Sequence, residues 1–551
     1  MTRTFVLPAA LVLTAVMLIT TGCVQQERFR FVPTTTPCFP ETATSQPVTG
    51  PSDQRPSLDC RRVQYKMAFI EFDEAGRMFD PQQDAAARRL LEFEKARARN
   101  GKIITVVYIH GWRNNAAEAP PGGKSKDVDK FQGALLEIGY RAEQAARAEN
   151  REPVPVVGIY MAWRGKSLMG PGWFTFTSLW SRRNAANRIG DGPDLGPFLE
   201  RIISLTNERN DNSRVLLIGH SFGARVLEHA IESKQISLYD PPTADAVVRP
   251  RVDLVLYVNS ANDSRLSMGR VQTLATSGVH VYHPDYQRDV CSQPAEPNAT
   301  AAAAELREAR CRDYPLLVAI TSRGDSATRY LLPIANTVNG DRLNADLAKR
   351  LAPLPTAGAY ADQTPSASTV RKAAAGHLGF LQSHDVREIS CPALRSPAQR
   401  QETKTIEALI DDAVRRAVGE ALGKPEDNAA RRKREAAETS RRRDEERIRT
   451  ERALHPVCPA GDAACRFVFR TQGDKPACYQ VDVRQPVAGK PPFNTTPFWI
   501  MSVEPTVIKD HGDIWNVSFV EMLGQLMAPR GFFEPTSPRM QLRAEPTPQR
   551  K

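Results

Sequence analysis

The 551-residue sequence lacks the patterns of several common protein classes. It has no C-x-x-C pair and no cysteine and histidine cluster with zinc spacing, so we expect no metal site. No internal repeat is visible, which argues against a solenoid or a propeller. The mean hydropathy is −0.41, which excludes a polytopic membrane protein. The remaining expectation is a globular chain long enough to bury at least one large core.

The charge balance gives little support for nucleic-acid binding. The chain carries 74 basic and 63 acidic residues, a net charge of +11. This excess is spread along the chain, except for arginine-rich runs in a charged helical stretch at about 398–453. Acidic residues between those runs indicate a solvated helix laced with ion pairs. We therefore expect no nucleic-acid partner.

Residues 1–22 have the features of a signal peptide. Arg3 precedes an apolar run at 5–19, which is too short for a comfortable transmembrane helix. The small residues before Cys23 resemble a bacterial lipoprotein processing box, although Thr20 stands where leucine is usual. The alternative is an ordinary signal peptide with an incidental cysteine. The resemblance implies a lipid anchor at Cys23 that holds the protein on a membrane on the periplasmic side of the cell envelope. Val24 is not the aspartate of an inner-membrane retention signal, so the outer membrane is favoured.

The nine cysteines then divide into one lipidated residue and eight others. An even number suits disulfide bonds in an oxidising periplasm. Connectivity does not follow from sequence, but local pairings come first: Cys38 with Cys60, Cys291 with Cys311, and Cys458 with Cys465 or Cys478, leaving Cys391 for the remainder.

Apolar runs and helical patterns alternate along much of the chain. Expected strands lie at 65–72, 103–109, 154–162, 214–218, 252–259, 314–321 and 498–508, and expected helices at 82–99, 127–149, 194–208, 223–234 and 517–527. The runs show no period-two alternation, as is typical of parallel strands buried on both faces. The fold class is therefore α/β, a doubly wound, mostly parallel sheet with helices on both sides.

Composition divides the chain further. We expect a flexible, Pro- and Thr-rich tether at 23–62 and a Pro-rich disordered tail at 531–551. The sheet domain spans 63–330 and 495–530. A long insertion before the last strand, 331–494, contains the charged helix.

The strongest chemical signal is the stretch from Gly219 to Gly223, G-H-S-F-G, between an expected strand and an expected helix. A serine flanked by glycines at such a turn presents its hydroxyl above the sheet, because a Cβ at either glycine would obstruct the close approach of the backbone. Ser221 is therefore the candidate nucleophile. The alternative is a turn with an incidental serine.

A second signal is His110-Gly111-Trp112 at the end of the strand at 103–109. Backbone N–H groups near Gly111 and Trp112, with that of Phe222, are placed to stabilise an oxyanion. His110 is expected to support that loop rather than act as the base.

With its HGW loop, its GHSFG turn and Trp163-Arg164-Gly165 after the intervening strand, the chain resembles the α/β-hydrolase superfamily, and within it bacterial esterase/lipase-like proteins. The resemblance covers about 65–330 and 495–530. It implies a Ser-acid-His triad, in that chain order, that hydrolyses an ester or related acyl bond without a cofactor.

Two aspartates are candidates for the acid. Asp325 follows the strand after next beyond the serine, and Asp263 closes the strand before that one. Either aspartate is also suited to cap a helix. We favour Asp325.

Three histidines are candidates for the general base. His511 follows an apolar strand and precedes a helix, as the end of such a fold requires. His377, in an A-G-H-L-G loop, and His384 have no convincing strand directly before them. We favour His511. For each of the three, the alternative is an ordinary surface histidine with no catalytic role.

The aromatic and basic segment 174–184 is expected either to cover the site, as a lid or acyl pocket, or to pack against the body. An anionic substrate is favoured if Arg182 or Arg183 faces the pocket.

These features predict a lipid-anchored serine hydrolase with an acyl-ester substrate. The rival hypothesis is a catalytically inactive envelope protein that keeps the fold as an interaction scaffold, with the charged helix as its binding element.

Overall fold

The computed structural model describes part of the chain. The described residues are 29–30, 65–98, 101–117, 127–148, 152–165, 174–208, 213–233, 236–239, 250–277, 315–338, 372–379, 381–389, 468–471, 477–483, 496–527 and 532. The signal segment, Cys23, most of the expected tether, the charged helix and all of the expected tail except residue 532 lie outside these residues. Within them, no helix has both the length and the apolar character to cross a membrane.

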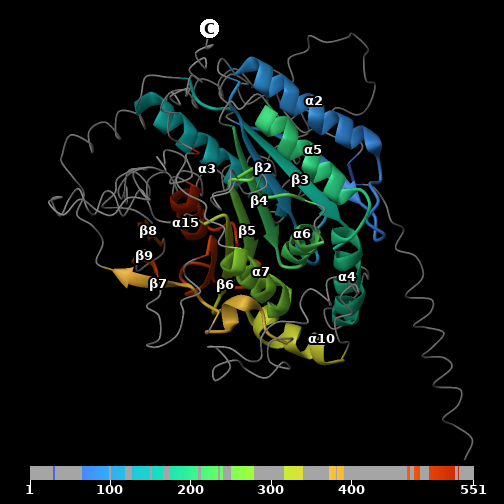
Figure 1. Ribbon diagram of the computed structural model, residues 1–551, viewed down its shortest axis with the longest axis vertical. Coiled ribbons are helices and arrows are strands. Elements are labelled where there is room, and N and C mark those ends of the chain that lie inside the picture. The colour runs from blue at the N-terminus through green and yellow to red at the C-terminus, as the bar shows by residue number, and fades with distance from the viewer. Residues whose placement is uncertain are drawn as a thin grey trace, which may run out of the picture.

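A seven-stranded parallel sheet forms the centre of the fold (Figure 1). Its strands are β1 (Tyr65–Phe72), β2 (Ile104–Ile109), β3 (Val156–Trp163), β4 (Arg214–His220), β5 (Leu254–Val258), β6 (Leu317–Ser322) and β10 (Phe498–Val503). They lie in the order β1-β3-β2-β4-β5-β6-β10, and each neighbouring pair is parallel. Six of the strands are buried at every position, and β1 is buried from its third residue on. The expected α/β fold class is confirmed, consistent with an α/β-hydrolase fold.

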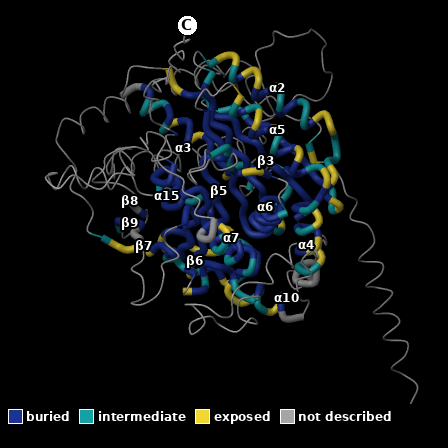
Figure 2. The backbone as a smooth tube through the Cα atoms, viewed as in Figure 1, coloured by how far each residue is buried: buried dark blue, intermediate teal, exposed yellow. Residues whose placement is uncertain are grey.

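Helices cover both faces of this sheet (Figure 1). One face packs against α2 (Pro81–Arg97), α4 (Phe174–Gly190), α5 (Leu195–Asn207), α6 (Phe222–Glu232) and α7 (Ser264–Ser277). The other face packs against α3 (Asp127–Ala148) and α15 (Val517–Met527). The residues of the strands between the two helix layers are buried (Figure 2). Burial on both sides explains why the strands read as continuous apolar runs.

The order of the strands reverses next to β2. The chain places β3 on one side of β2 and β4 on the other. Loops that leave the carboxyl ends of β2 and β4 therefore diverge, and a crevice at such a point is the usual ligand site of an open parallel sheet. Gly111 follows the carboxyl end of β2, and Ser221 follows the carboxyl end of β4.

Parts of the expected insertion fold onto the body. Strands β7 (His384–Ile389), β9 (Cys478–Val483) and β8 (Val468–Arg470) form a small antiparallel sheet in that order. It contacts β10 and α15. Ser383 joins the insertion to β10 directly, since its N–H donates to the Ile500 carbonyl and the Ile500 N–H donates to its Oγ, both at 2.9 Å.

Cys478 is disulfide-bonded. All other cysteines of the chain lie outside the described residues, so the predicted pairings stay predictions.

The prediction of a strand at 498–508 is wrong for its second half. Strand β10 ends at Val503, and the chain then turns, with the Glu504 carbonyl accepting the N–H groups of Val507 and Ile508. Pro505 has no N–H to give to a sheet and cannot extend the strand. The sequence pattern did not predict helix α7. Asp263 directly precedes this helix and caps it by accepting the Arg265 N–H.

Candidate active site

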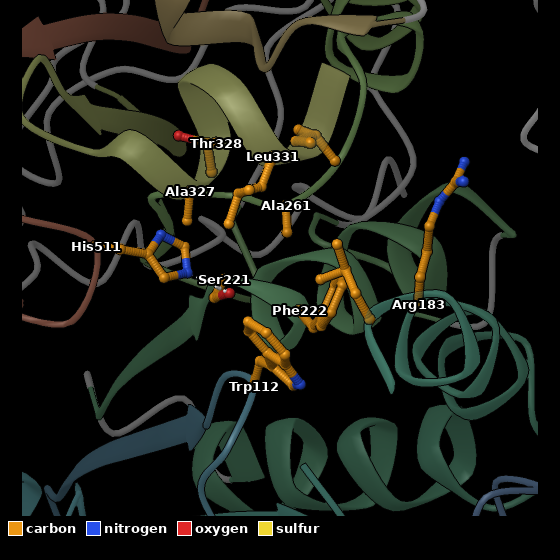
Figure 3. A pocket seen from close by; sticks show the side chains of 11 residues that line it. Trp112, Arg183, Ser221, Phe222, Ala261, Ala327, Thr328, Leu331 and His511 are labelled. Atoms are coloured by element: carbon orange, nitrogen blue, oxygen red, sulfur yellow. Dashed lines mark hydrogen bonds between the residues drawn. The ribbon is translucent and has the colours of Figure 1, made fainter. Parts of the chain in front are cut away.

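Ser221 lies at a sharp turn between β4 and α6. Its backbone has φ 57° and ψ −121°, a conformation rare for a side-chain-bearing residue. A Cβ at Gly223 would lie 2.1 Å from the Ile109 carbonyl oxygen, and one at Gly219 would lie 2.5 Å from the Ala224 Cα. The flanking glycines therefore allow the turn, which directs the Ser221 hydroxyl out of the sheet (Figure 3).

His511 and Asp325 complete a hydrogen-bonded chain with Ser221. The Nε2 atom of His511 lies 2.7 Å from Ser221 Oγ, and its Nδ1 atom lies 2.9 Å from Asp325 Oδ2. Asp325 is fully buried, Ser221 is 2% exposed and the side chain of His511 is 22% exposed. The imidazole is the most accessible of the three groups and points towards Ser221 (Figure 3). This arrangement allows a proton to pass from the hydroxyl to the ring.

Asp325 is held as an ionised acceptor. Burial favours its neutral form, but His511 and Thr328 outweigh burial and lower the pKa of the carboxyl below its usual value. Its Oδ1 atom accepts the N–H groups of Ala327 and Thr328 at 2.9 and 3.1 Å. These contacts hold the carboxylate at the start of the π-helical turn η2 (Ala327–Leu331), a rare conformation that is frequent at functional sites.

The loop after β2 is fixed by contacts with the end of β3. The His110 ring stacks on Trp163, with centroids 5.8 Å apart and an interplanar angle of 4°. Its Nε2 accepts the Trp163 N–H at 3.1 Å, and the Trp163 indole donates to the His110 carbonyl at 3.0 Å. Burial lowers the pKa of His110 to about 4, so the ring stays neutral and serves the loop rather than a proton transfer.

Gly111 packs closely on the serine. A Cβ at this position would lie 2.7 Å from Ser221 Cβ. Trp112 and Phe222 line the same pocket as Ser221 and His511. Phe222 is the first residue of α6, where N–H groups have no acceptor within the helix. The three residues predicted to hold an oxyanion, Gly111, Trp112 and Phe222, therefore lie beside Ser221.

The other candidate residues have different positions. Asp263 forms an ion pair with Arg265 at 2.8 Å and accepts the Arg265 backbone N–H, the helix-capping alternative considered above. His384, in the insertion, stacks on Trp499 of β10 with ring centroids 3.8 Å apart. His377 does not contact Ser221 and instead lies 3.0 Å from Thr328 Oγ1.

The segment 174–184 lies in helix α4. Its Leu179 and Arg183 line the pocket, whereas Arg182 pairs with Glu74 and donates to the Arg164 carbonyl. The pocket is otherwise mostly apolar, with Ala261, Ala327, Leu331 and Leu332 among its lining residues. Its cavity volume is about 20 Å³, room for about one water molecule, so an acyl group must displace side chains as it enters.

Two residues near the site had no recognisable sequence signal. His220 Nε2 donates to the main-chain carbonyl of His511 at 2.7 Å, and Asn259 Nδ2 donates to the same oxygen at 3.2 Å. Asn259 has φ 47°, a conformation that asparagine adopts more readily than most residues.

Comparisons with known proteins add limited information. No protein-family model matches the chain, and no curated protein matches it significantly. One matching solved structure is described as an extracellular alpha/beta-hydrolase from a Paenibacillus species that shares structural and functional homology with tobacco salicylic acid binding protein 2. The match has 11% sequence identity and a TM-score of 0.13, and it covers 41% of this chain and 79% of that chain. The sheet order carries the α/β fold class.

Proposed function

We propose that the chain is a serine hydrolase that cleaves an ester or a related acyl bond. The observation that carries the proposal is the position of the His511 ring, whose two nitrogens lie 2.7 Å from Ser221 Oγ and 2.9 Å from Asp325 Oδ2. An imidazole hydrogen-bonded to both a hydroxyl and a buried carboxylate is the arrangement that activates serine as a nucleophile.

The proposed reaction has two halves. Ser221 Oγ attacks the acyl carbonyl while His511 Nε2 takes the hydroxyl proton, and Asp325 stabilises the imidazolium. The backbone N–H groups of Phe222 and of the Gly111-Trp112 loop hold the oxyanion. His511 then protonates the leaving group, which leaves an acyl-serine. Water, deprotonated by His511, attacks the acyl-serine, and His511 returns the proton to Ser221 Oγ as the C–O bond breaks and the acid leaves.

The pocket supports an inference about the acyl group. Apolar side chains around Ser221, including Leu179 and Leu331, favour a small apolar acyl group. Arg183 also lines the pocket, but its guanidinium points away from Ser221 and His511 (Figure 3), so the lining gives no support for an anionic substrate. The expected preference for a small apolar acyl group is measured by comparing kcat/KM for neutral esters of short and of long carboxylic acids.

Covalent labelling with a fluorophosphonate tests the proposal. The wild-type protein is expected to take up one label per active chain, and Ser221→Ala to take up none and to lose turnover by several orders of magnitude. Ser213→Ala is the matched control, because Ser213 is a buried serine just before the opposite end of the same strand. Absence of labelling in the wild type would favour the alternative, a catalytically inactive scaffold protein in the envelope.

We also propose that the protein is held on the bacterial envelope membrane by a lipid at Cys23. The support is the signal-like segment before this residue, and the outer membrane is the favoured site. Cys23→Ser is expected to move the protein from the membrane fraction to the soluble fraction. A wild-type protein that is already soluble after cell lysis would contradict the anchor.

A further inference from the structure

A second histidine is connected to the candidate triad through a threonine. Thr328 Oγ1 lies 2.5 Å from Asp325 Oδ2, the same carboxylate oxygen that His511 contacts. Thr328 Oγ1 also lies 3.0 Å from His377 Nε2. A continuous chain of hydrogen bonds therefore runs from Ser221 through His511, Asp325 and Thr328 to His377.

The direction of these bonds follows from the number of protons. A threonine hydroxyl has one proton to donate, and an ionised carboxylate can only accept. The hydroxyl of Thr328 must therefore donate to Asp325, so the N–H of His377 donates to the lone pair of Thr328. Burial lowers the pKa of His377, which favours the neutral ring, and the hydrogen bond to Thr328 Oγ1 places the single proton of that ring on Nε2.

The His377 turn is fixed on the main sheet. It forms the short 3-10 helix η3 (Ala375–His377) inside the expected insertion. A Cβ at Gly376 would lie 2.3 Å from Thr321 Oγ1, so only glycine allows this turn to approach β6 so closely. Gln382 Nε2 donates to the Gly376 carbonyl at 2.8 Å, and Ser264 Oγ donates to the Ala373 carbonyl at 2.5 Å.

We propose that Thr328 and His377 are positioning residues for the acid of the triad, and that the insertion contributes to the active site by supplying His377. This inference rests on the proposed hydrolase function. Donation from His377 polarises the Thr328 hydroxyl and strengthens its bond to Asp325, because successive hydrogen bonds reinforce one another in a buried network. The oxygen that faces His511 is then held in one orientation, and the imidazole remains aligned with Ser221.

Two pairs of variants test this proposal. Thr328→Val removes the hydroxyl but keeps the shape of the side chain, and we expect kcat to fall about tenfold with KM nearly unchanged. Thr328→Ser keeps the hydroxyl and is expected to retain wild-type kcat. His377→Leu removes the donor and is expected to lower kcat about threefold, whereas His377→Gln keeps an N–H near the same point and restores it.

Matched controls separate positioning from general stability. Thr206→Val removes a fully buried hydroxyl that is hydrogen-bonded to Thr105, near the amino end of β2 and away from the strand ends that carry the site. His384→Leu removes a buried ring of the same insertion. Both controls are expected to keep wild-type kcat even if the melting temperature falls. Circular dichroism of every variant establishes that it is folded.

Phosphonate labelling of the wild type decides whether the hydrolase proposal itself stands. Given a labelled wild type, unchanged kcat in folded Thr328→Val would overturn the positioning role. Equal losses in His377→Leu and His384→Leu, or failure of His377→Gln to restore kcat, would overturn the role of His377.

Discussion

His220 Nε2 donates a hydrogen bond to the main-chain carbonyl of His511, with 2.7 Å between the two atoms. His220 directly precedes Ser221, so this bond links the strand of the candidate nucleophile to the loop of the candidate base. Burial, together with the neighbouring His511, lowers the pKa of His220 to about 3, which keeps the His220 ring neutral. A neutral ring with its proton on Nε2 is the donor that the carbonyl requires.

We predict that His220→Leu lowers the rate of phosphonate labelling about tenfold, because the His511 loop loses a buried hydrogen bond. His220→Gln keeps an N–H at a similar distance and is expected to label at nearly the wild-type rate. Stopped-flow labelling of both folded variants provides the measurement. Equal rates in His220→Leu and the wild type would show that Asn259 suffices to hold the loop.

Glu228 predicts an effect of pH on stability. Burial raises the pKa of this carboxyl to about 7, although Ser267 and Asn262 donate hydrogen bonds that lower it. The folded state keeps this proton at pH values where the unfolded state, with a pKa near 4.5, has released it. The stabilisation that Glu228 contributes is therefore full below about pH 4.5 and is lost as pH rises to about 7.

Glu228→Gln removes this titration and keeps a group that can accept from Asn262 and donate to Ser267. We expect the free energy of unfolding of the variant minus that of the wild type to be about 2 to 3 kcal/mol higher at pH 8.5 than at pH 5, because only the wild type loses stability over this range. Urea unfolding at the two pH values gives both numbers. A difference that does not change with pH would show that Glu228 stays ionised throughout.

Two glycine substitutions should have opposite effects on stability. Gly223→Ala would bring a Cβ to 2.1 Å from a β2 carbonyl, and we expect it to prevent correct folding of the turn and abolish labelling. Gly133 lies inside α3 with nothing within 4 Å of a Cβ. Gly133→Ala is expected to raise the free energy of unfolding by about 0.5 to 1 kcal/mol, since alanine is the better helix former. Thermal unfolding tests both, and a destabilised Gly133→Ala would reject this argument.

Part of the expected tether contacts the body. The Glu71 carboxylate accepts the backbone N–H groups of Phe29 and Arg30 at 2.9 and 2.8 Å, and Arg30 Nε donates to the Ala116 carbonyl at 2.7 Å. We predict that Glu71→Ala accelerates tryptic cleavage after Arg30, because the bound segment is released. Glu92→Ala, an exposed glutamate of α2, is the control and should be cleaved at the wild-type rate. Equal cleavage rates in the two variants would show that Glu71 does not hold this segment.

Several elements were predictable because their signals are local. The apolar runs that became β1, β2 and β4 could only be buried on both faces, and that property implied a parallel sheet with helices on either side. The glycines around Ser221 marked a turn because backbone geometry forbids a Cβ there. Errors arose where one residue changed the outcome, as Pro505 did in ending the last strand early.

The fold class, the turn at Ser221 and a short set of acids and histidines could be predicted from the residues alone, since these depend on neighbouring residues and on hydrophobic periodicity. Which of these acids and histidines meet depends on how distant segments come together in the folded chain. His511 reaches Ser221 because β10 joins the sheet beside β6 across a long insertion, and strand order is a long-range property. The contacts of His220 with a carbonyl and of His377 with Thr328 were equally hidden, because a hydrogen bond between segments distant in the chain leaves no periodic pattern in the sequence.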